Sequence, residues 1–169
     1  MKTTLSLIVR EQASVLDNLF QLYVHDFSEF WAGTERGDLS VEGLFEHNPF
    51  VDSYWTDPKR EALFIQVGGA LAGFVLINDH SHSGQPLDRS IAEFFVVRKY
   101  RGQGVGRAAA HAAFARHPGI WEAAIARKNL PALAFWRDTV ATMPGAKDVR
   151  ELDVTNIDWD GPILRFVRD

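Results

Sequence analysis

Cysteine is missing from the 169-residue sequence, and this absence excludes several classes of site. Without thiols the protein can have no disulfide framework, no thiolate metal site and no cysteine nucleophile. The composition fits a reducing compartment, so we expect a cytoplasmic protein. A chain of this length can bury one sizeable core without crosslinks, and we therefore expect a single domain over residues 1–169.

Long apolar runs are also missing. No segment approaches the roughly 18 apolar residues that a membrane span needs. The N-terminal sequence MKTTLSLIVREQAS has too short an apolar run for a signal peptide, because Arg10 and Glu11 follow at once. We therefore expect neither export nor a membrane partner.

An excess of positive charge is the third absence, since the net charge is -4. Residues 1–60 hold five basic and ten acidic side chains, whereas residues 61–169 hold thirteen and twelve. Four basic residues nevertheless lie in one ten-residue window without a carboxylate, namely Arg98, Lys99, Arg101 and Arg107. This pattern predicts a local site for a small phosphate-bearing molecule and argues against nucleic acid as a partner.

The order of apolar segments predicts a mixed α/β fold. We expect strands at residues 3–10, 63–67, 71–78, 90–97, 121–126, 149–154 and 163–167, and helices at 14–27, 41–46, 104–116 and 131–140. Gly68 and Gly69 suit a hairpin turn, so the strands on either side of them should be antiparallel. The strand at 90–97 is mostly apolar, which predicts a central position in the sheet.

Two of these helices have an apolar face in their sequence. The first, which Ser14 can cap, places five large side chains at helical spacing: Leu16, Leu19, Phe20, Tyr23 and Phe27. The helix at 104–116 has a face of small side chains that would let it lie close to a sheet: Val105, Ala108, Ala109 and Ala112.

A glycine-rich turn with Gly102, Gly104 and Gly106 opens the helix at 104–116. Such a turn directs several backbone N–H groups to one place, where the positive end of the helix dipole also favours an anion. Arg107 occupies the place of the third glycine of a dinucleotide-binding motif, and no Gly-Lys-Ser/Thr follows, so neither a dinucleotide nor a nucleoside-triphosphate loop is supported. By themselves the three glycines fit a plain structural turn equally well.

The residues around this turn resemble those of a known family. The stretch FFVVRKYRGQGVGRAAA resembles the signature of the GNAT superfamily of acetyl-coenzyme-A-dependent N-acyltransferases, R/Q-x-x-G-x-G/A after a strand, with matches at Arg101, Gly104 and Gly106. Downstream, NLPALAFW at 129–136 is similar to the family's N-x-x-A-x-x-F-Y segment. The resemblance implies a mixed, mostly antiparallel central sheet flanked by helices, with a parallel strand pair splayed to admit the cofactor. It also implies one N-acetyltransferase domain over residues 1–169 and is compatible with a homodimer.

Carried over residue by residue, the resemblance implies acetyl-CoA as co-substrate and no metal. The pyrophosphate would lie on the backbone of residues 101–107, and the pantetheine arm would pair with the backbone of Val96 and Val97. Arg98, Lys99 or Arg107 would contact the remaining phosphate. The implied cofactor-binding residues are Phe95, Val96, Val97, Arg101, Gly102, Gln103, Gly104, Val105, Gly106, Arg107, Asn129, Ala132, Phe135 and Trp136.

Glu93 is the catalytic residue that we expect. An ammonium group has no lone pair with which to attack a thioester, so a base must accept a proton, directly or through water. Glu93 lies on the strand that would flank the thioester, among apolar neighbours whose burial would raise its pKa. It also matches a position where members of the family often carry an acidic base. The competing interpretation is a solvated or salt-bridged strand carboxylate.

Trp136 departs from the family, which often has a tyrosine at this position to protonate the leaving thiolate. Indole cannot serve as that acid. Tyr23, Tyr54 or His25 could replace it, or solvent could protonate the thiolate without help.

The acceptor site is expected in the acidic first third of the chain, where carboxylates and aromatic rings together suit a cationic amine. The candidate acceptor-binding residues are Tyr23, His25, Asp26, Trp31 and Tyr54. His80 and His82 are interpreted as solvent-exposed loop residues rather than metal ligands. The predicted function is an N-acetyltransferase that acts on a primary amine of a small molecule or peptide. The alternative is a non-catalytic module that binds or senses acyl-CoA.

Overall fold

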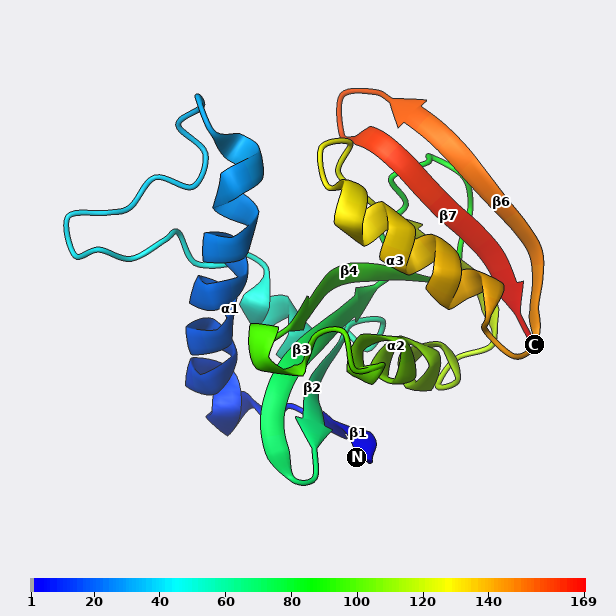
Figure 1. Ribbon diagram of the computed structural model, residues 1–169, viewed down its shortest axis with the longest axis horizontal. Coiled ribbons are helices and arrows are strands. Elements are labelled where there is room, and N and C mark those ends of the chain that lie inside the picture. The colour runs from blue at the N-terminus through cyan, green and yellow to red at the C-terminus, as the bar shows by residue number, and fades with distance from the viewer. Residues whose placement is uncertain (1) are drawn as a thin grey trace.

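The computed structural model describes residues 2–169, which form one seven-stranded sheet with helices on both faces (Figure 1). The strands are β1 (Thr3–Leu7), β2 (Glu61–Val67), β3 (Ala70–Asn78), β4 (Arg89–Val96), β5 (Gly119–Ala124), β6 (Ala146–Thr155) and β7 (Asp160–Arg168). The helices are α1 (Ala13–Ser28), α2 (Val105–Phe114) and α3 (Leu130–Ala141). The predicted mixed α/β class is confirmed.

The sheet has the order β1-β2-β3-β4-β5-β7-β6, and β4 with β5 is its one parallel pair of neighbours. β4 therefore lies at the centre, as its apolar sequence predicted. β2 and β3 form the predicted hairpin on Gly68 and Gly69. Their φ angles of 58° and 85° cause no steric strain in glycine, because it has no Cβ.

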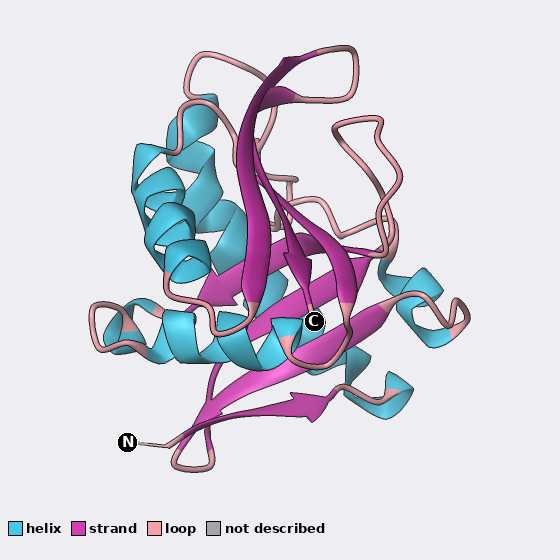
Figure 2. Cartoon of the chain, turned by 90° about the vertical axis from the view of Figure 1, so that its right-hand side faces the viewer, coloured by secondary structure: helices cyan, strands magenta, loops and turns pink. Residues whose placement is uncertain are grey.

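The parallel strands separate soon after they begin to pair. β4 and β5 pair only at Arg89–Trp121, Ser90–Glu122 and Ile91–Ala123. Beyond Ile91, β4 stays paired with β3 as far as Val96, whereas β5 follows β7. Figure 2 shows the long β6–β7 hairpin standing apart from the layer that the earlier strands form. The predicted splay of the parallel pair is confirmed.

Each face of the sheet has its own apolar core. Trp121 and Phe114 lie in the core under α2 and α3, whereas Phe74 lies in the core under α1. Side chains of β4 alternate between these faces: Phe95 packs under α1, and Phe94 packs against α2 and α3. The same alternation places the Glu93 side chain on the α1 face.

The predicted face of α1 is present, but the helix begins differently. Leu16 and Leu19 are buried, and the other three residues of the face are partly buried. α1 begins at Ala13, directly after a 3₁₀ turn at Arg10–Gln12, so the predicted cap at Ser14 is wrong and this residue lies in the first turn.

Two further predictions need correction. Ala108 and Ala112 are exposed, because α2 packs on both the sheet and α3 and therefore buries a different stripe: Val105, Ala109, Ala110, Ala113 and Phe114. The predicted helix at 41–46 is a loop. Val41 is 99% exposed and Gly43 has a φ of 74°, so the segment has no buried apolar face to stabilise a short helix. No helix in residues 2–169 is long and apolar enough to cross a membrane.

Candidate active site

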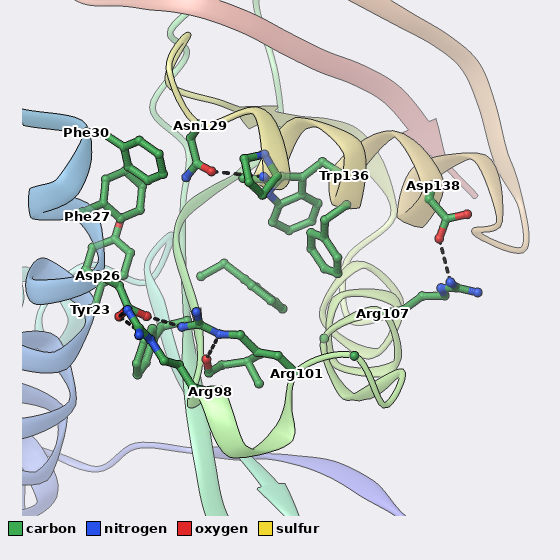
Figure 3. Close-up of a pocket in the computed structure, with 18 of the residues that line it drawn as sticks. Tyr23, Asp26, Phe27, Phe30, Arg98, Arg101, Arg107, Asn129, Trp136 and Asp138 are labelled. Atoms are coloured by element: carbon green, nitrogen blue, oxygen red, sulfur yellow. Dashed lines mark hydrogen bonds and ion pairs between the residues drawn. The ribbon is translucent and has the colours of Figure 1, made fainter.

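The first cavity, of about 580 Å³, lies between the end of β4, the turn before α2 and the start of α3 (Figure 3). α1 lines one side of it with Tyr23, Asp26 and Phe27. Most of the predicted cofactor-binding residues line this cavity, namely Phe95, Val96, Arg101, Gly102, Gly104, Gly106, Arg107, Asn129, Ala132, Phe135 and Trp136.

Three predicted cofactor-binding residues do not line the first cavity. Val105 is buried in the core, and Gln103 donates from its side-chain amide to the Lys99 carbonyl at the surface (2.8 Å). The N–H of Val97 donates to Ala72 of β3 (2.8 Å) and is therefore not free to pair with a ligand. Because backbone groups alternate along a strand, the N–H and C=O of Val96 point away from β3, into the gap between β4 and β5.

The turn before α2 has the geometry expected of an anion cradle. Gly104 ends this turn with a φ of 78°, and Gly102 has a φ of 71°. The first backbone bond of α2 runs from the Ala108 N–H to the Gly104 carbonyl (3.0 Å), so within residues 2–169 the N–H groups of residues 105–107 have no backbone acceptor. Free N–H groups at a helix N-terminus, with the positive end of its dipole, suit phosphate.

Gly106 is required for packing rather than for the turn. A Cβ at this position would lie 3.1 Å from the Phe135 ring. Glycine therefore lets the start of α2 approach α3, which brings the cradle next to the α3 side of the cavity.

Three arginines surround the cradle, and each one pairs with a carboxylate. Arg98 and Arg101 both donate to Asp26 of α1, and Arg107 pairs with Asp138 of α3 (2.7 Å), as Figure 3 shows. Arg101 also donates to the Val96 carbonyl (2.7 Å). Partial burial tends to raise the pKa of Asp26, but its bonds to Arg101 and Arg98 lower the pKa below the usual range.

The start of α3 closes the other side of the first cavity. The Asn129 side-chain oxygen caps the helix by accepting the Ala132 N–H (3.1 Å), and Pro131 lies in the first turn as predicted. Trp136 is only 6% exposed, and its ring meets the Phe94 ring edge-on at 5.1 Å. The residue that departs from the family pattern is therefore an apolar wall of the cavity.

A second cavity, of about 810 Å³, lies among α1, the loop at 32–50, residues 123–126 and the turn between β6 and β7. The two cavities share six lining residues: Tyr23, Phe27, Phe94, Asn129, Ala132 and Trp136. They therefore adjoin each other beside the part of β4 that has left β5.

Glu93 lines the second cavity, where its carboxylate accepts a hydrogen bond from the Tyr23 hydroxyl. Burial raises the pKa of Glu93 to about 7, although the Tyr23 hydrogen bond and the Arg36 charge act in the opposite direction. Burial, and then the Glu93 charge, raise the pKa of Tyr23 well above its usual value. No ion pair within residues 2–169 includes Glu93, so the salt-bridged alternative does not describe its surroundings.

The candidate acceptor residues fall into three places. Tyr23 and Trp31 line the second cavity with Glu93, and Asp26 lines the first. His25 is exposed, and Tyr54 is buried in the core under α1. Neither of the last two is among the residues that line the first or the second cavity, so the structure does not bring them to the site.

The residues of the second cavity that were not predicted as site residues include Arg36, His82, Asp158 and Trp159. The interpretation of His82 as a solvent-exposed loop residue is wrong. Its ring stacks on Trp159 (4.5 Å), its backbone carbonyl accepts from the Asn156 side chain (3.1 Å), and burial lowers its pKa. No local sequence signal predicts that these residues lie together, because they come from three separate segments. Within residues 2–169, no three His, Asp or Glu side chains are grouped as a metal site requires.

Comparison with known proteins agrees with this geometry. A search of curated protein sequences gives no match. Among solved structures, a GNAT-family acetyltransferase from Streptococcus agalactiae superposes with a TM-score of 0.67 at 11% identity, over 99% of this chain and 96% of that one. An acetyltransferase from Thermus thermophilus gives 0.64 at 18% identity, over 99% and 97%. An aminoglycoside acetyltransferase in complex with coenzyme A gives 0.64 at 13% identity, over 99% and 94%. At these identities the likeness establishes the fold.

The sequence model of the acetyltransferase (GNAT) family matches residues 16–139. This match covers more than half of the chain and includes the turn before α2 and the start of α3. The protein therefore belongs to the GNAT family of acetyltransferases.

Proposed function

We propose that this protein transfers the acetyl group of acetyl-CoA to a primary amine of a small molecule or peptide, with Glu93 as the base. A single cytoplasmic domain over residues 1–169 is part of the same proposal. The observation that carries it is the position of Glu93: a carboxylate with a pKa of about 7 lines a cavity that adjoins the anion cradle.

The first cavity supports acetyl-CoA as the donor substrate. Free N–H groups at the start of α2 suit its pyrophosphate, and Arg98, Arg101 and Arg107 offer charge to its phosphates. The pantetheine arm would lie along the outward-facing side of β4 at Val96, whose carbonyl accepts from Arg101. The aminoglycoside acetyltransferase of the same fold binds coenzyme A, which is consistent with this assignment.

In this proposal Glu93 makes the amine reactive. A carboxylate with a pKa of about 7 can accept a proton from an ammonium group at neutral pH, and general base catalysis is most effective when the pKa of the base lies near the working pH. The Val96 N–H, which points into the gap, is the natural donor to the carbonyl oxygen as negative charge develops there.

The second cavity supports a cationic acceptor. Four carboxylates that belong to no ion pair within residues 2–169 lie around it, namely Glu35, Asp38, Glu46 and Asp158. Its walls include the aromatic rings of Trp31 and Trp159, and the Arg36 guanidinium lies over the Trp31 ring (4.2 Å), as a cation does on a π face. Arg36 is the one arginine or lysine in the lining. The negative charges therefore outnumber the positive ones where the amine would enter.

A non-catalytic module that senses acyl-CoA is the alternative, because it would need the same cradle. The second cavity favours catalysis. Burying an ionisable group costs stability, and binding of acyl-CoA alone does not require one. The buried Glu93 carboxylate, hydrogen-bonded to Tyr23 beside the cofactor cavity, is therefore better explained by catalysis than by sensing.

Calorimetric titration with acetyl-CoA, followed by thiol release against a panel of amines, tests the proposal. Suitable amines are a linear diamine, an aminoglycoside and a lysine-containing peptide. Binding with amine-dependent thiol release supports the transferase. Binding without release favours the sensor, and the absence of binding contradicts both.

A further inference from the structure

Tyr23 occupies the junction between the two cavities. It lines both of them, and its hydroxyl donates to the Glu93 carboxylate. Its ring is held edge-on against Phe74 and Phe95, at centroid distances of 5.8 and 6.1 Å. These contacts hold the ring at the junction of the two cavities, with its hydroxyl bonded to the proposed base.

Tyr23 is also the suitable proton donor in the first cavity. Among the described residues that line it, the other ionisable side chains are three arginines, which pair with Asp26 and Asp138, and the exposed Glu29. Trp136 has no acidic proton, and Tyr54 and His25 line neither cavity. Tyr23 therefore carries the one hydroxyl group among the described residues that line the first cavity.

We propose that Tyr23 is the general acid that protonates the departing thiolate, and that Glu93 and Tyr23 act as one proton relay between the two cavities. This inference rests on the proposed acetyl transfer. Glu93 takes a proton from the acceptor ammonium, and the freed nitrogen lone pair forms the new C–N bond. As the C–S bond breaks and its electron pair leaves with sulfur, Tyr23 gives its hydroxyl proton to the sulfur. The proton on Glu93 then passes to the tyrosine oxygen, and the amide nitrogen loses its extra proton to water.

The acidities of the pair favour such a relay. A tyrosine whose pKa lies well above its usual value is by itself a poor acid toward a thiolate with a pKa of about 8.5. In the relay the net donor is protonated Glu93, whose pKa of about 7 makes transfer to the thiolate favourable. The hydrogen bond between the two residues therefore decides whether Tyr23 can act.

The charged and titratable groups around the pair are few. Arg36, from the loop at 32–50, lowers the pKa of both Glu93 and Tyr23. Burial raises the pKa of Tyr54, from the 3₁₀ turn at Val51–Trp55; the Arg60 charge acts in the opposite direction, and the Glu93 charge adds to the rise. β3 and β4 present the apolar rings of Phe74 and Phe95. Asp26 lies one turn further along α1, where Arg98 and Arg101 hold it.

The test compares Tyr23→Phe with Tyr54→Phe, a matched change outside both cavities. Tyr23→Phe keeps the ring and its packing, so the fold should survive. We expect its alkaline rate plateau to fall about 10- to 100-fold. The acid limb of the pH profile should also move to higher pH, because the Tyr23 hydrogen bond that lowers the pKa of Glu93 is lost. The affinity for coenzyme A should be unchanged, and Tyr54→Phe should keep the wild-type plateau.

A second readout needs no turnover. In the ligand-free protein, carbon NMR titration of the Glu93 carboxyl should give a pKa of about 7, and a higher value in Tyr23→Phe. An unchanged pKa would overturn the relay, because the hydrogen bond would then be absent. If the alkaline rate plateau of Tyr23→Phe equals that of wild type, Tyr23 is not the general acid and only affects the pKa of Glu93. A lower plateau in Tyr54→Phe alone would assign the acid to Tyr54. If wild-type protein releases no thiol with any amine of the panel, the proposed function fails as well.

Discussion

The two cavities of this protein are built in different ways. Most of the first comes from two short stretches of chain, residues 94–107 and 129–138, and uses backbone N–H groups and arginines that suit any phosphate. The second is assembled from α1, the loop at 32–50, the loop that carries His82, and the β6–β7 turn. Its polar groups are side chains from these separate segments. Under the proposed function, recognition of the donor is therefore encoded locally, whereas recognition of the acceptor depends on the tertiary fold.

The largest expected effect is on the rate of acetyl transfer in Glu93→Gln, a change that should leave the binding of acetyl-CoA intact. Glu93→Gln should slow acetyl transfer about 10²- to 10⁴-fold at neutral pH, because the amide cannot accept the proton. The wild-type rate should rise with pH through a limb near the Glu93 pKa of about 7, and the variant should lose this limb. Rates of thiol release across neutral and alkaline pH provide the measurement.

Calorimetry is the control for Glu93→Gln. Glu93 does not line the first cavity, so the affinity for acetyl-CoA should stay within about twofold of wild type, which is the spread expected for independent sites. A variant with wild-type rate and pH profile would remove Glu93 as base. A variant with greatly weakened acetyl-CoA binding would instead show that the two cavities do not act separately.

The second expected effect lies in the cradle. Gly104→Asp should abolish detectable acetyl-CoA binding, roughly a 100-fold loss or more, because it places a carboxylate where phosphate should lie. Gly104→Asn is the matched control. Asparagine has the same shape without the charge, and it tolerates the φ of 78° better than most residues. Equal, near-wild-type affinity of both variants by calorimetry would contradict the cradle.

The same contrast explains what the sequence could predict. The hairpin at Gly68 and Gly69, the central β4 and the glycine turn depend on residues close together in the chain, and these predictions were confirmed. The buried stripe of α2 was predicted wrongly because it depends on α3, which packs beside it. The spacing of small residues in α2 carries no information about that second contact.

The second cavity could not be predicted for the same reason. His82 lies in a polar loop with no apolar pattern, and only contact with Trp159 buries it. Glu93 was predicted from its place on an apolar strand and from a family pattern, whereas its hydrogen bond with Tyr23 joins residues seventy positions apart. Only the excess of acidic residues in the first third hinted at the cationic preference of the proposed acceptor site.

A smaller effect is expected at the rim of the second cavity. Glu46 lines it and Glu42 does not, although both are glutamates of the same loop. Glu46→Gln should raise the KM for a cationic amine about two- to fivefold, the size of one exposed ion pair, with kcat unchanged. The difference from Glu42→Gln should shrink at high salt. Equal KM values for the two variants at low salt would argue against the acidic rim.

The smallest expected effect concerns Asp26, which holds two arginines of the first cavity. A phosphate must compete with this carboxylate for Arg98 and Arg101, so Asp26→Asn should tighten acetyl-CoA binding about two- to fivefold at low salt. The variant should also be less stable at neutral pH. Because the pKa of Asp26 is lowered, its ion pairs stabilise the fold above the unfolded-state pKa and are lost as pH falls through the folded-state value. The stability difference between Asp26→Asn and wild type should therefore vanish in acid. Weaker binding in calorimetry would instead mean that Asp26 positions the arginines for the phosphate, and the carboxylate would then belong to the donor site rather than compete with it.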